Sequence, residues 1–225
     1  DHFDFVRFNA DFAYTVDGGE VGGIECENFN AAAADITVHG VNTHPGTAKN
    51  KMKNAILLAN QFISLLPAAE APAHTEGYEG FYHVTDLAGN ESQVVLHAII
   101  RDHDLEKFNA RKAFVQQLVD YLNARWGQGT FRLEMKDSYY NMKEKLADCM
   151  FLIWDAEKAL REVGVEPVIV PIRGGTDGAQ LSFRGLPCPN LSTGGYCYHG
   201  VNEFVPVSSL VKMTDVLQEL VARFA

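Results

Sequence analysis

Cysteines, basic residues and long apolar runs are all scarce in this sequence, and each shortage excludes a class of protein. The 225 residues include four cysteines, none of which forms a C-x-x-C pair. This spacing argues against a zinc ribbon, a thioredoxin-like site and a disulfide scaffold, and it favours a reducing, cytoplasmic setting. No apolar run reaches the roughly 18 residues that a membrane span needs, and no signal peptide is visible, so we expect no membrane partner.

Basic residues are outnumbered by acidic ones. The 19 lysines and arginines face 29 aspartates and glutamates, which gives a formal net charge of −10 at pH 7. Because an acidic chain without a basic stripe is repelled by phosphate backbones, we expect no nucleic-acid partner. The 47% hydrophobic and 21% charged residues are typical of a soluble globular protein, and the length suits one large domain or two small ones.

The middle of the chain alternates between strand and helix patterns. Apolar residues recur at every second position in the expected strands and at helical spacing in the expected helices. We predict strands over 34–41, 80–86, 93–102 and 130–138, one helix over 50–66, and a second helix that Asp104 caps and that runs to Trp126. The order β-α-β-β-α-β is that of a ferredoxin-like module, with two helices on one face of a sheet and the other face free.

The flanking segments have a different, α/β character. We predict short strands over 12–16 and 24–29, an amphipathic helix over 143–163 closed by Gly164, a buried parallel strand over 167–172, and a final helix from about Leu210 to Phe224. These pieces contain too few strands to close a doubly wound sheet. The sequence therefore predicts an incomplete α/β domain, made of residues 1–30 and 141–225, with a module inserted over residues 31–140.

Asp17 ends the first expected strand, in the stretch "AYTVDGG". Ligand-binding and catalytic groups of open α/β sheets gather at the carboxyl ends of strands, and Gly18 and Gly19 permit tight bending of the backbone beside a ligand. An ordinary Asp-Gly turn is the alternative. The stretch alone does not decide between the two interpretations.

His199 lies in the stretch "GGYCYHGVNEF". Histidine is the most frequent metal ligand and acid–base group, and a structural or solvated histidine is the alternative. A nucleophile in the pair Cys197-x-His199 is not supported, because no acid is clearly positioned to orient the imidazole. The spacing His2-x-Asp4 also fits a metal pair, but no strand pattern precedes it.

The stretch "IRGGTDGAQLSF" places Arg173, Gly174, Gly175 and Thr176 before a short helix that Thr176 or Asp177 caps. Helix N-termini attract anions, so this loop is a candidate binding element. A tight loop held by its glycines is the alternative. It is not a Walker A loop, because no G-K-[ST] follows.

Two more residues have a candidate chemical role. His44, in "GVNTHPGTAK", lies between an expected strand and an expected helix, and loop polarity is the alternative to a catalytic role. Arg101 ends a long apolar strand, where its planar guanidinium could hold a carboxylate with two parallel hydrogen bonds. A surface ion pair is the alternative for Arg101.

Eight motifs in a fixed order carry a family resemblance along the whole chain. They are "AYTVDGG", "ENFNAA", "GVNTHPGTAKN", "EGYEGFYH", "IIRDHD", "DSYYNM", "PIRGGTDGAQLS" and "GLPCPNLSTGGYCYHGVNEF". In this order they resemble the peptidase T enzymes, the tripeptide aminopeptidases of the M20 metallopeptidase family. The resemblance implies a two-zinc α/β catalytic domain with an inserted ferredoxin-like lid that forms a homodimer.

The resemblance also implies a role for each candidate residue. Asp17 would be a terminal ligand of one zinc ion, and His199 would be the ligand of the other. His44 would reach from the lid to the reacting carbonyl, in the site of the partner subunit, and stabilise the oxyanion. Arg101 would bind the C-terminal carboxylate of the tripeptide. The loop Arg173–Thr176 would line the substrate pocket.

The same resemblance implies that part of the active site lies outside this chain. In the family, an H-x-D ligand pair, a bridging Asp and an adjacent Glu-Glu pair precede these motifs, and the first Glu is the general base. This chain has no Glu-Glu pair and no matching H-x-D context. We therefore expect this chain to be the C-terminal part of a zinc aminopeptidase and to be inactive by itself. The alternative is a non-catalytic fragment for dimerisation and binding.

Overall fold

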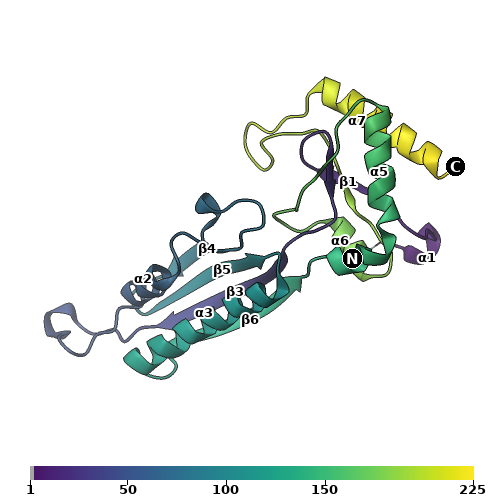
Figure 1. The fold of residues 1–225 in the computed structure, drawn as a ribbon. Coiled ribbons are helices and arrows are strands. Elements are labelled where there is room, and N and C mark those ends of the chain that lie inside the picture. The colour runs from purple at the N-terminus through teal and green to yellow at the C-terminus, as the bar shows by residue number, and fades with distance from the viewer. Residues whose placement is uncertain (1–2) are drawn as a thin grey trace. The chain divides into compact units, whose positions relative to one another are not determined.

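A computed structural model describes residues 3–225, which form two compact units (Figure 1). One unit comprises residues 29–139. The other comprises the described residues up to 28 together with residues 140–225. The pair His2-x-Asp4 lies partly outside the described residues, since these begin at residue 3. Each unit has a sheet and a hydrophobic core of its own.

The unit of residues 29–139 contains a four-stranded antiparallel sheet in the order β4-β5-β3-β6. Its elements follow one another as β3 (Asn30–His39), α2 (Ala55–Leu65), β4 (Phe81–Gly89), β5 (Gln93–Asp102), α3 (Leu105–Trp126) and β6 (Phe131–Tyr139). Short 3-10 turns lie at η1 (Pro45–Thr47) and η2 (Pro72–His74). The predicted element order β-α-β-β-α-β is therefore present in the structure.

Alternation along the strands explains why the helices cover one face of this sheet. In β3, Ala34, Ile36 and Val38 are fully buried in a core to which α2 contributes Phe62 and α3 contributes Leu122. The residues between them point to the other face, which no helix of this unit covers. Period-two burial of this kind is typical of an antiparallel sheet with one solvated face. Within this unit, α2 and α3 thus lie on one face of the sheet.

Capping residues set the start of both helices. The side chain of Asp104 accepts a hydrogen bond from the Lys107 N–H at 2.8 Å, as predicted. Asn54 caps α2 in the same way, so the helix begins at Ala55 and not at residue 50. Residues 50–54 are excluded from the helix because Lys53 pairs with Val41 in an antiparallel bridge.

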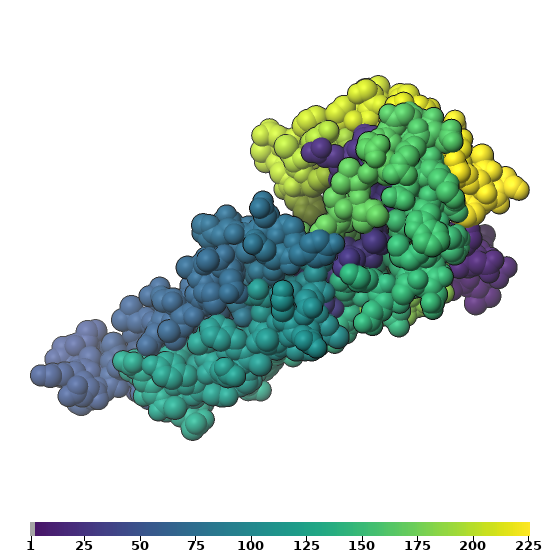
Figure 2. Space-filling view, in the orientation of Figure 1, coloured from purple at the N-terminus to yellow at the C-terminus, as the bar shows by residue number. Residues whose placement is uncertain are grey.

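The second unit contains a mixed sheet in the order β1-β8-β2-β7. Strands β1 (Thr15–Gly18) and β8 (Asn190–Ser192) are parallel, β2 (Gly23–Glu25) is antiparallel to β8, and β7 (Val168–Ile169) is parallel to β2. Helices α5 (Phe151–Glu162) and α7 (Val207–Arg223) pack against this sheet around Ile24, Ile153, Leu191 and Met213. Both helices also lie at the surface of the space-filling view (Figure 2).

Several short elements complete this unit. They are α1 (Phe5–Phe8), α4 (Lys143–Leu146), η3 (Ala147–Cys149) and α6 (Asp177–Phe183). The helix expected over 143–163 is thus divided into three pieces. It ends as predicted: Gly164 has a φ of 77°, its N–H donates to the Arg161 carbonyl at 3.0 Å, and the Val165 N–H donates to the Leu160 carbonyl at 2.9 Å. These two bonds form a Schellman motif.

Three strand predictions in this unit are partly wrong. The strand expected over 24–29 is shorter and ends at Glu25. The first strand runs from Thr15 to Gly18, whereas the sequence predicted a buried strand that begins at Phe12 and ends at Asp17; Val16 and Asp17 are exposed. The strand expected to be buried over 167–172 is reduced to Val168 and Ile169, which are 53% and 50% exposed. Strand β7 forms the edge of the sheet. It is therefore exposed although its residues are apolar. No helix within residues 3–225 is long and apolar enough to cross a membrane.

The core of the unit of residues 29–139 gives a stability prediction. Leu122→Ala is expected to lower the free energy of unfolding by about 2–5 kcal/mol, because it leaves a cavity at a fully buried position. Leu105→Ala, on the same helix but at a side chain that is 48% exposed, is the matched control and is expected to change little. Urea unfolding followed by circular dichroism measures both. Equal losses for the two variants would contradict the assigned core.

Candidate functional site

Asp17 lies at an interruption of the sheet. In the parallel pairing of β1 with β8, Val16 is opposite Leu191 and Gly18 is opposite Ser192, and the register shifts between Val16 and Gly18. Asp17 occupies this bulge, and it is exposed. Bulges re-aim a side chain and are frequent beside active sites. The structure therefore places the Asp17 carboxylate at the surface, on a strand and not in a simple turn.

Gly18 must be a glycine because the chain approaches its neighbours closely there. A Cβ atom at Gly18 would lie 2.9 Å from the Leu191 carbonyl oxygen and 3.0 Å from Oε2 of Glu25. The Gly18 carbonyl accepts three hydrogen bonds, from the Thr193 N–H at 3.1 Å, from the Thr193 hydroxyl at 2.9 Å and from the Tyr198 hydroxyl at 3.1 Å. These contacts bind the end of β1 to the segment that follows β8.

His199 lies in that following segment. Its side chain is exposed and its φ is 62°, in the left-handed region. The His199 N–H donates to Oε2 of Glu203 at 2.8 Å, and the rings of Tyr196 and Phe204 stack with centroids 5.4 Å apart at the base of the loop. The Tyr198 hydroxyl donates a hydrogen bond to the Gly18 carbonyl. Tyr198 precedes His199 and Gly18 follows Asp17, so the immediate neighbours of the two candidate ligands are in direct contact. The structure thus brings the two predicted metal ligands to one region of the same unit.

Glu25 is a carboxylate of this region that the sequence analysis missed. It lies on β2, only 8% exposed, and its Oε2 accepts a hydrogen bond from Nδ2 of Asn190 at 3.1 Å. Burial raises the pKa of Glu25, and the nearby charge of Asp17 raises it further, while hydrogen bonds from Asn190 and from the Gly19 backbone lower it. A lone acid inside the short apolar pattern "GIEC" was the available signal.

The Thr176 side chain contributes to the fold of the same region. Its hydroxyl donates to Oδ1 of Asn190 at 2.8 Å and accepts from the Gly178 N–H at 3.2 Å. Thr176 is therefore the cap of α6, one of the two residues predicted for that role. Of the remaining loop residues, Gly175 is exposed and Gly174 and Arg173 are half-buried, and a Cβ at Gly174 would meet open space.

A hydrogen bond within its own loop favours one tautomer of His44, in the other unit. Its Nδ1 accepts a hydrogen bond from the Gly46 N–H at 3.1 Å. A nitrogen that accepts carries no proton, so the neutral imidazole holds its proton on Nε2 and presents an N–H donor. His44 is exposed and lines a pocket of about 710 Å³, together with Asn42, Thr43, Pro45, Met52, Asn54 and Glu91.

Arg101 lies near the end of β5. One terminal nitrogen of its guanidinium donates to the Ala32 carbonyl at 3.0 Å and to the Ile100 carbonyl at 2.9 Å. The group lies over the ring of Tyr139, with its central carbon 5.4 Å from the ring centroid. No ion pair of Arg101 is found among residues 3–225, so the structure does not favour the surface ion pair. Backbone and ring contacts orient the guanidinium instead.

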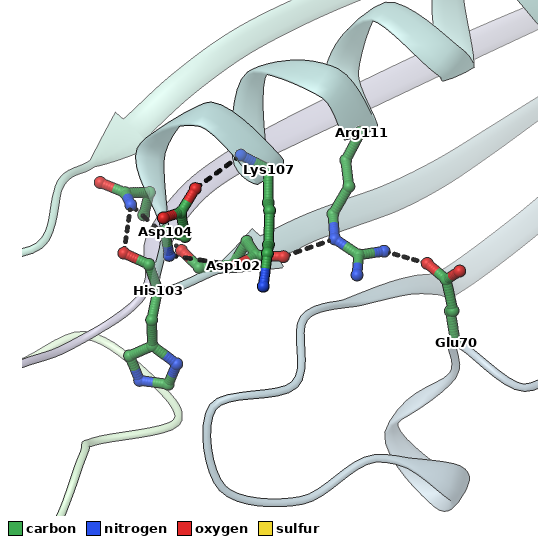
Figure 3. A network of polar contacts seen from close by, with 7 residues as sticks. Glu70, Asp102, His103, Asp104, Lys107 and Arg111 are labelled. Carbon is green, nitrogen blue, oxygen red and sulfur yellow. Dashed lines mark hydrogen bonds and ion pairs between the residues drawn. The ribbon is translucent and has the colours of Figure 1, made fainter.

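The residue after Arg101 belongs to a network that fixes the end of β5 (Figure 3). Asp102, whose side chain is 2% exposed, accepts from Nε of Arg111 at 2.7 Å, and it also accepts from the Asp104 N–H at 3.0 Å. Arg111 forms a second ion pair with Glu70. A buried carboxylate needs such a partner, because an unpaired buried charge is strongly destabilising. The network holds the start of α3 and the loop before β4 to the strand that carries Arg101.

The donor atoms of Asp17 and His199 are of types that zinc binds, a carboxylate oxygen and an imidazole nitrogen. A zinc site needs at least three protein ligands, and within residues 3–225 no three His, Cys, Asp or Glu side chains are grouped closely enough to hold a metal ion. The two residues thus fit the chemistry of the ion, and the described residues do not complete its coordination.

Comparisons with known proteins give a consistent result. Residues 26–130 match the family described as the peptidase dimerisation domain, M20_dimer. Peptidase T of Halothermothrix orenii is 54% identical over 225 residues, which are 100% of this chain and 55% of that protein. Peptidase T of Clostridium novyi is 53% identical over the same shares. The chain therefore spans little more than half the length of these relatives and matches their C-terminal part.

Solved structures share the fold. Aminopeptidase PepT from Bacillus cereus superimposes with a TM-score of 0.79 at 24% identity, over 97% of this chain and 58% of that one. A tripeptidase from Staphylococcus aureus superimposes with a TM-score of 0.83 at 22% identity, over the same shares. At these identities the likeness establishes a common fold of mixed α/β type.

Two cysteines of the unit that contains Asp17 provide a test of its structure. Burial raises the pKa of Cys188 to about 11, whereas Cys197 is exposed beside His199. Since the thiolate is the reactive form, we expect iodoacetamide to modify Cys197 first and Cys188 last at mildly alkaline pH. Peptide mass spectrometry over time measures both rates, and the unfolded chain, in which the rates converge, is the control. Rapid native labelling of Cys188 would contradict its placement.

Proposed function

We propose that this chain, which is related throughout its length to peptidase T of the M20 peptidases, is the C-terminal part of a zinc-dependent aminopeptidase that releases the N-terminal residue of tripeptides. The observation that carries the proposal is the contact between Tyr198 and Gly18, which brings the neighbours of Asp17 and His199 together. The identity of over half to peptidase T proteins supports the same activity. We place the complete enzyme in the cytoplasm.

Asp17 and His199 would hold zinc, each as a terminal ligand of one of two ions. A bridging Asp, further ligands and the general-base Glu would come from a part of the enzyme outside this chain. When bound, two zinc ions supply a water of lowered pKa and polarise the scissile carbonyl. This chain would then fix the direction of the two terminal ligands. The bulge of β1 would orient Asp17, and the hydrogen bond from the His199 N–H to Glu203 would hold the loop of His199.

Residues 29–139 would form the lid and dimerisation domain. The antiparallel order β4-β5-β3-β6, with both helices on one face, supports a ferredoxin-like lid. The match of residues 26–130 to the M20 dimerisation domain supports a homodimer through it. In such a dimer, His44 would enter the site of the partner subunit and donate from Nε2 to the developing oxyanion.

Substrate selection would depend on both ends of the peptide. Arg101, oriented by Tyr139 and two backbone carbonyls, would bind the C-terminal carboxylate of the tripeptide. The loop Arg173–Thr176 would line the substrate pocket through Arg173 and its glycines, because the Thr176 hydroxyl already bonds Asn190. A site that binds a free amine and a free carboxylate at a fixed separation selects peptides by length.

A non-catalytic fragment for dimerisation and binding is the second candidate. The observation that favours it is that, within residues 3–225, no three His, Cys, Asp or Glu side chains are grouped closely enough to hold a metal ion. Both candidates predict self-association through residues 29–139. They differ in whether the complete protein depends on Asp17 and His199 for zinc binding and tripeptide hydrolysis.

Removing either proposed ligand tests the metal site. In the complete enzyme, Asp17→Ala and His199→Ala are each expected to lose zinc and abolish tripeptide hydrolysis, because each ion loses a terminal ligand. Asp11→Ala and His74→Ala, which change exposed residues elsewhere, are the controls and should retain both. Zinc content by elemental analysis and tripeptide turnover are the measurements. Full zinc content and turnover in Asp17→Ala and His199→Ala would refute the assignment.

Replacing His44 separates catalysis from metal binding. His44→Ala is expected to lower kcat by about 10²–10³-fold, as when one oxyanion donor is removed, with zinc content unchanged. His39→Ala, an exposed histidine in the same unit, is the control. Steady-state kinetics with a tripeptide, beside zinc analysis of the same samples, measures both effects. Unchanged kcat in His44→Ala would exclude the donor role.

The 225-residue chain by itself tests whether this part of the enzyme can form a complete metal site. We expect it to bind zinc weakly and to hydrolyse no tripeptide, because two donors do not form a complete site. Equilibrium dialysis with Zn²⁺ and a ninhydrin assay of released amino acid are the measurements, with the complete enzyme as the positive control. Turnover by a sample of verified intact mass would show that the remaining ligands lie within this chain.

A further inference from the structure

We propose that Glu25 is a positioning residue that fixes the direction of the Asp17 carboxylate from beneath the bulge of β1. The proposal rests on the function proposed above, because it treats Asp17 as a metal ligand. Glu25 does not act as a ligand itself. It holds the backbone that follows Asp17, and through that backbone it sets where the Asp17 oxygens point.

The carboxylate of Glu25 touches the two residues that follow Asp17. A Cβ atom added at Gly18 would lie 3.0 Å from Oε2 of Glu25 and 3.1 Å from its carboxyl carbon. Gly18 therefore packs directly against the Glu25 carboxylate. The Gly19 backbone donates a hydrogen bond to the same carboxylate. Glu25 therefore determines the path of the chain at both positions immediately after the candidate ligand.

A row of polar side chains holds Glu25 in place across three strands. Glu25 on β2 is paired with Asn190 on β8, which is paired with Thr15 on β1. The Asn190 amide donates to Glu25 at 3.1 Å, and its carbonyl oxygen accepts from Thr15 and from Thr176 at 2.8 Å. With both ends of the amide engaged, Asn190 cannot rotate without losing these bonds.

No ion pair among the described residues compensates the burial of the Glu25 carboxylate. Among residues 3–225, the groups that act on its charge are Asn190, Gly19 and Asp17, and none of them is a cation. A buried carboxylate without a cationic partner is unfavourable, and the neighbouring charge of Asp17 adds to that. Ionisable side chains in such unfavourable surroundings concentrate at functional sites. Outer contacts of this kind typically orient metal ligands.

The test measures metal binding in the complete protein that contains this chain. Glu25→Ala is expected to raise the Zn²⁺ dissociation constant by about 10–100-fold, measured by competition with a chelator. It is also expected to change the visible absorption of bound Co²⁺, which reports the direction of the ligands. Ser182→Ala, which removes another buried hydrogen-bonding side chain of the same unit, is the matched control and should change neither measurement.

An exchange of side chains tests the mechanism even if Glu25→Ala does not fold. Asn190→Asp would place two carboxylates in contact and is expected to weaken zinc binding. Adding Glu25→Gln moves the amide to β2 and restores every hydrogen bond of the row, so the double variant should recover zinc affinity. Failure of this rescue, or unchanged zinc affinity and Co²⁺ absorption in Glu25→Ala, would overturn the proposal.

Asp17→Ala distinguishes this inference from the proposed function. If Asp17→Ala retains its zinc, Asp17 is not a ligand, and the proposed function and the role of Glu25 both fail. If Asp17→Ala loses zinc while Glu25→Ala keeps full affinity and the wild-type Co²⁺ spectrum, only the positioning role fails. Loss of affinity in both variants, with rescue in the exchanged pair, supports the two proposals together.

Discussion

The buried amide of Asn190 is the interaction on which the candidate site depends. It joins the sheet in both directions, to Glu25 on one neighbouring strand and to Thr15 on the other, and it also bonds Thr176 at the start of α6. A buried amide is stable only when its donor and acceptor are both satisfied. The same bonds that remove this penalty fix the strand that carries Asp17.

The two units keep their shape by different means. The unit of residues 29–139 relies on alternation, since alternate residues over 32–38 of β3 and 94–100 of β5 enter one apolar core with α2 and α3. The other unit has strands of only two to four residues, too short for alternation to bury much area. There, glycines at close approaches and buried polar bonds specify the arrangement, as at Gly18. The candidate ligands Asp17 and His199 accordingly lie where the backbone is irregular, at a bulge and at a residue with a φ of 62°.

Local patterns in the sequence predicted what depends on neighbours in the chain. Strand β5 matches the predicted 93–102 because its period-two alternation is complete, and Asp104 and Gly164 end their elements as expected. Burial was less predictable: 167–172 is apolar, yet β7 lies exposed at the edge of a sheet. Glu25 was missed because its partner Asn190 lies 165 positions away, a distance at which no periodicity connects two residues.

The pairing of Ala31 with Tyr139 has a consequence for how this architecture arose. The chain enters the unit of residues 29–139 on β3 and leaves it on the adjacent, antiparallel β6, so the two ends of the unit meet. A segment whose ends meet can be added to a host gene, or removed from it, in one genetic event, because the host chain needs only a short splice to close. The two units are therefore separable in evolution, because a single pair of strands marks where one was joined to the other.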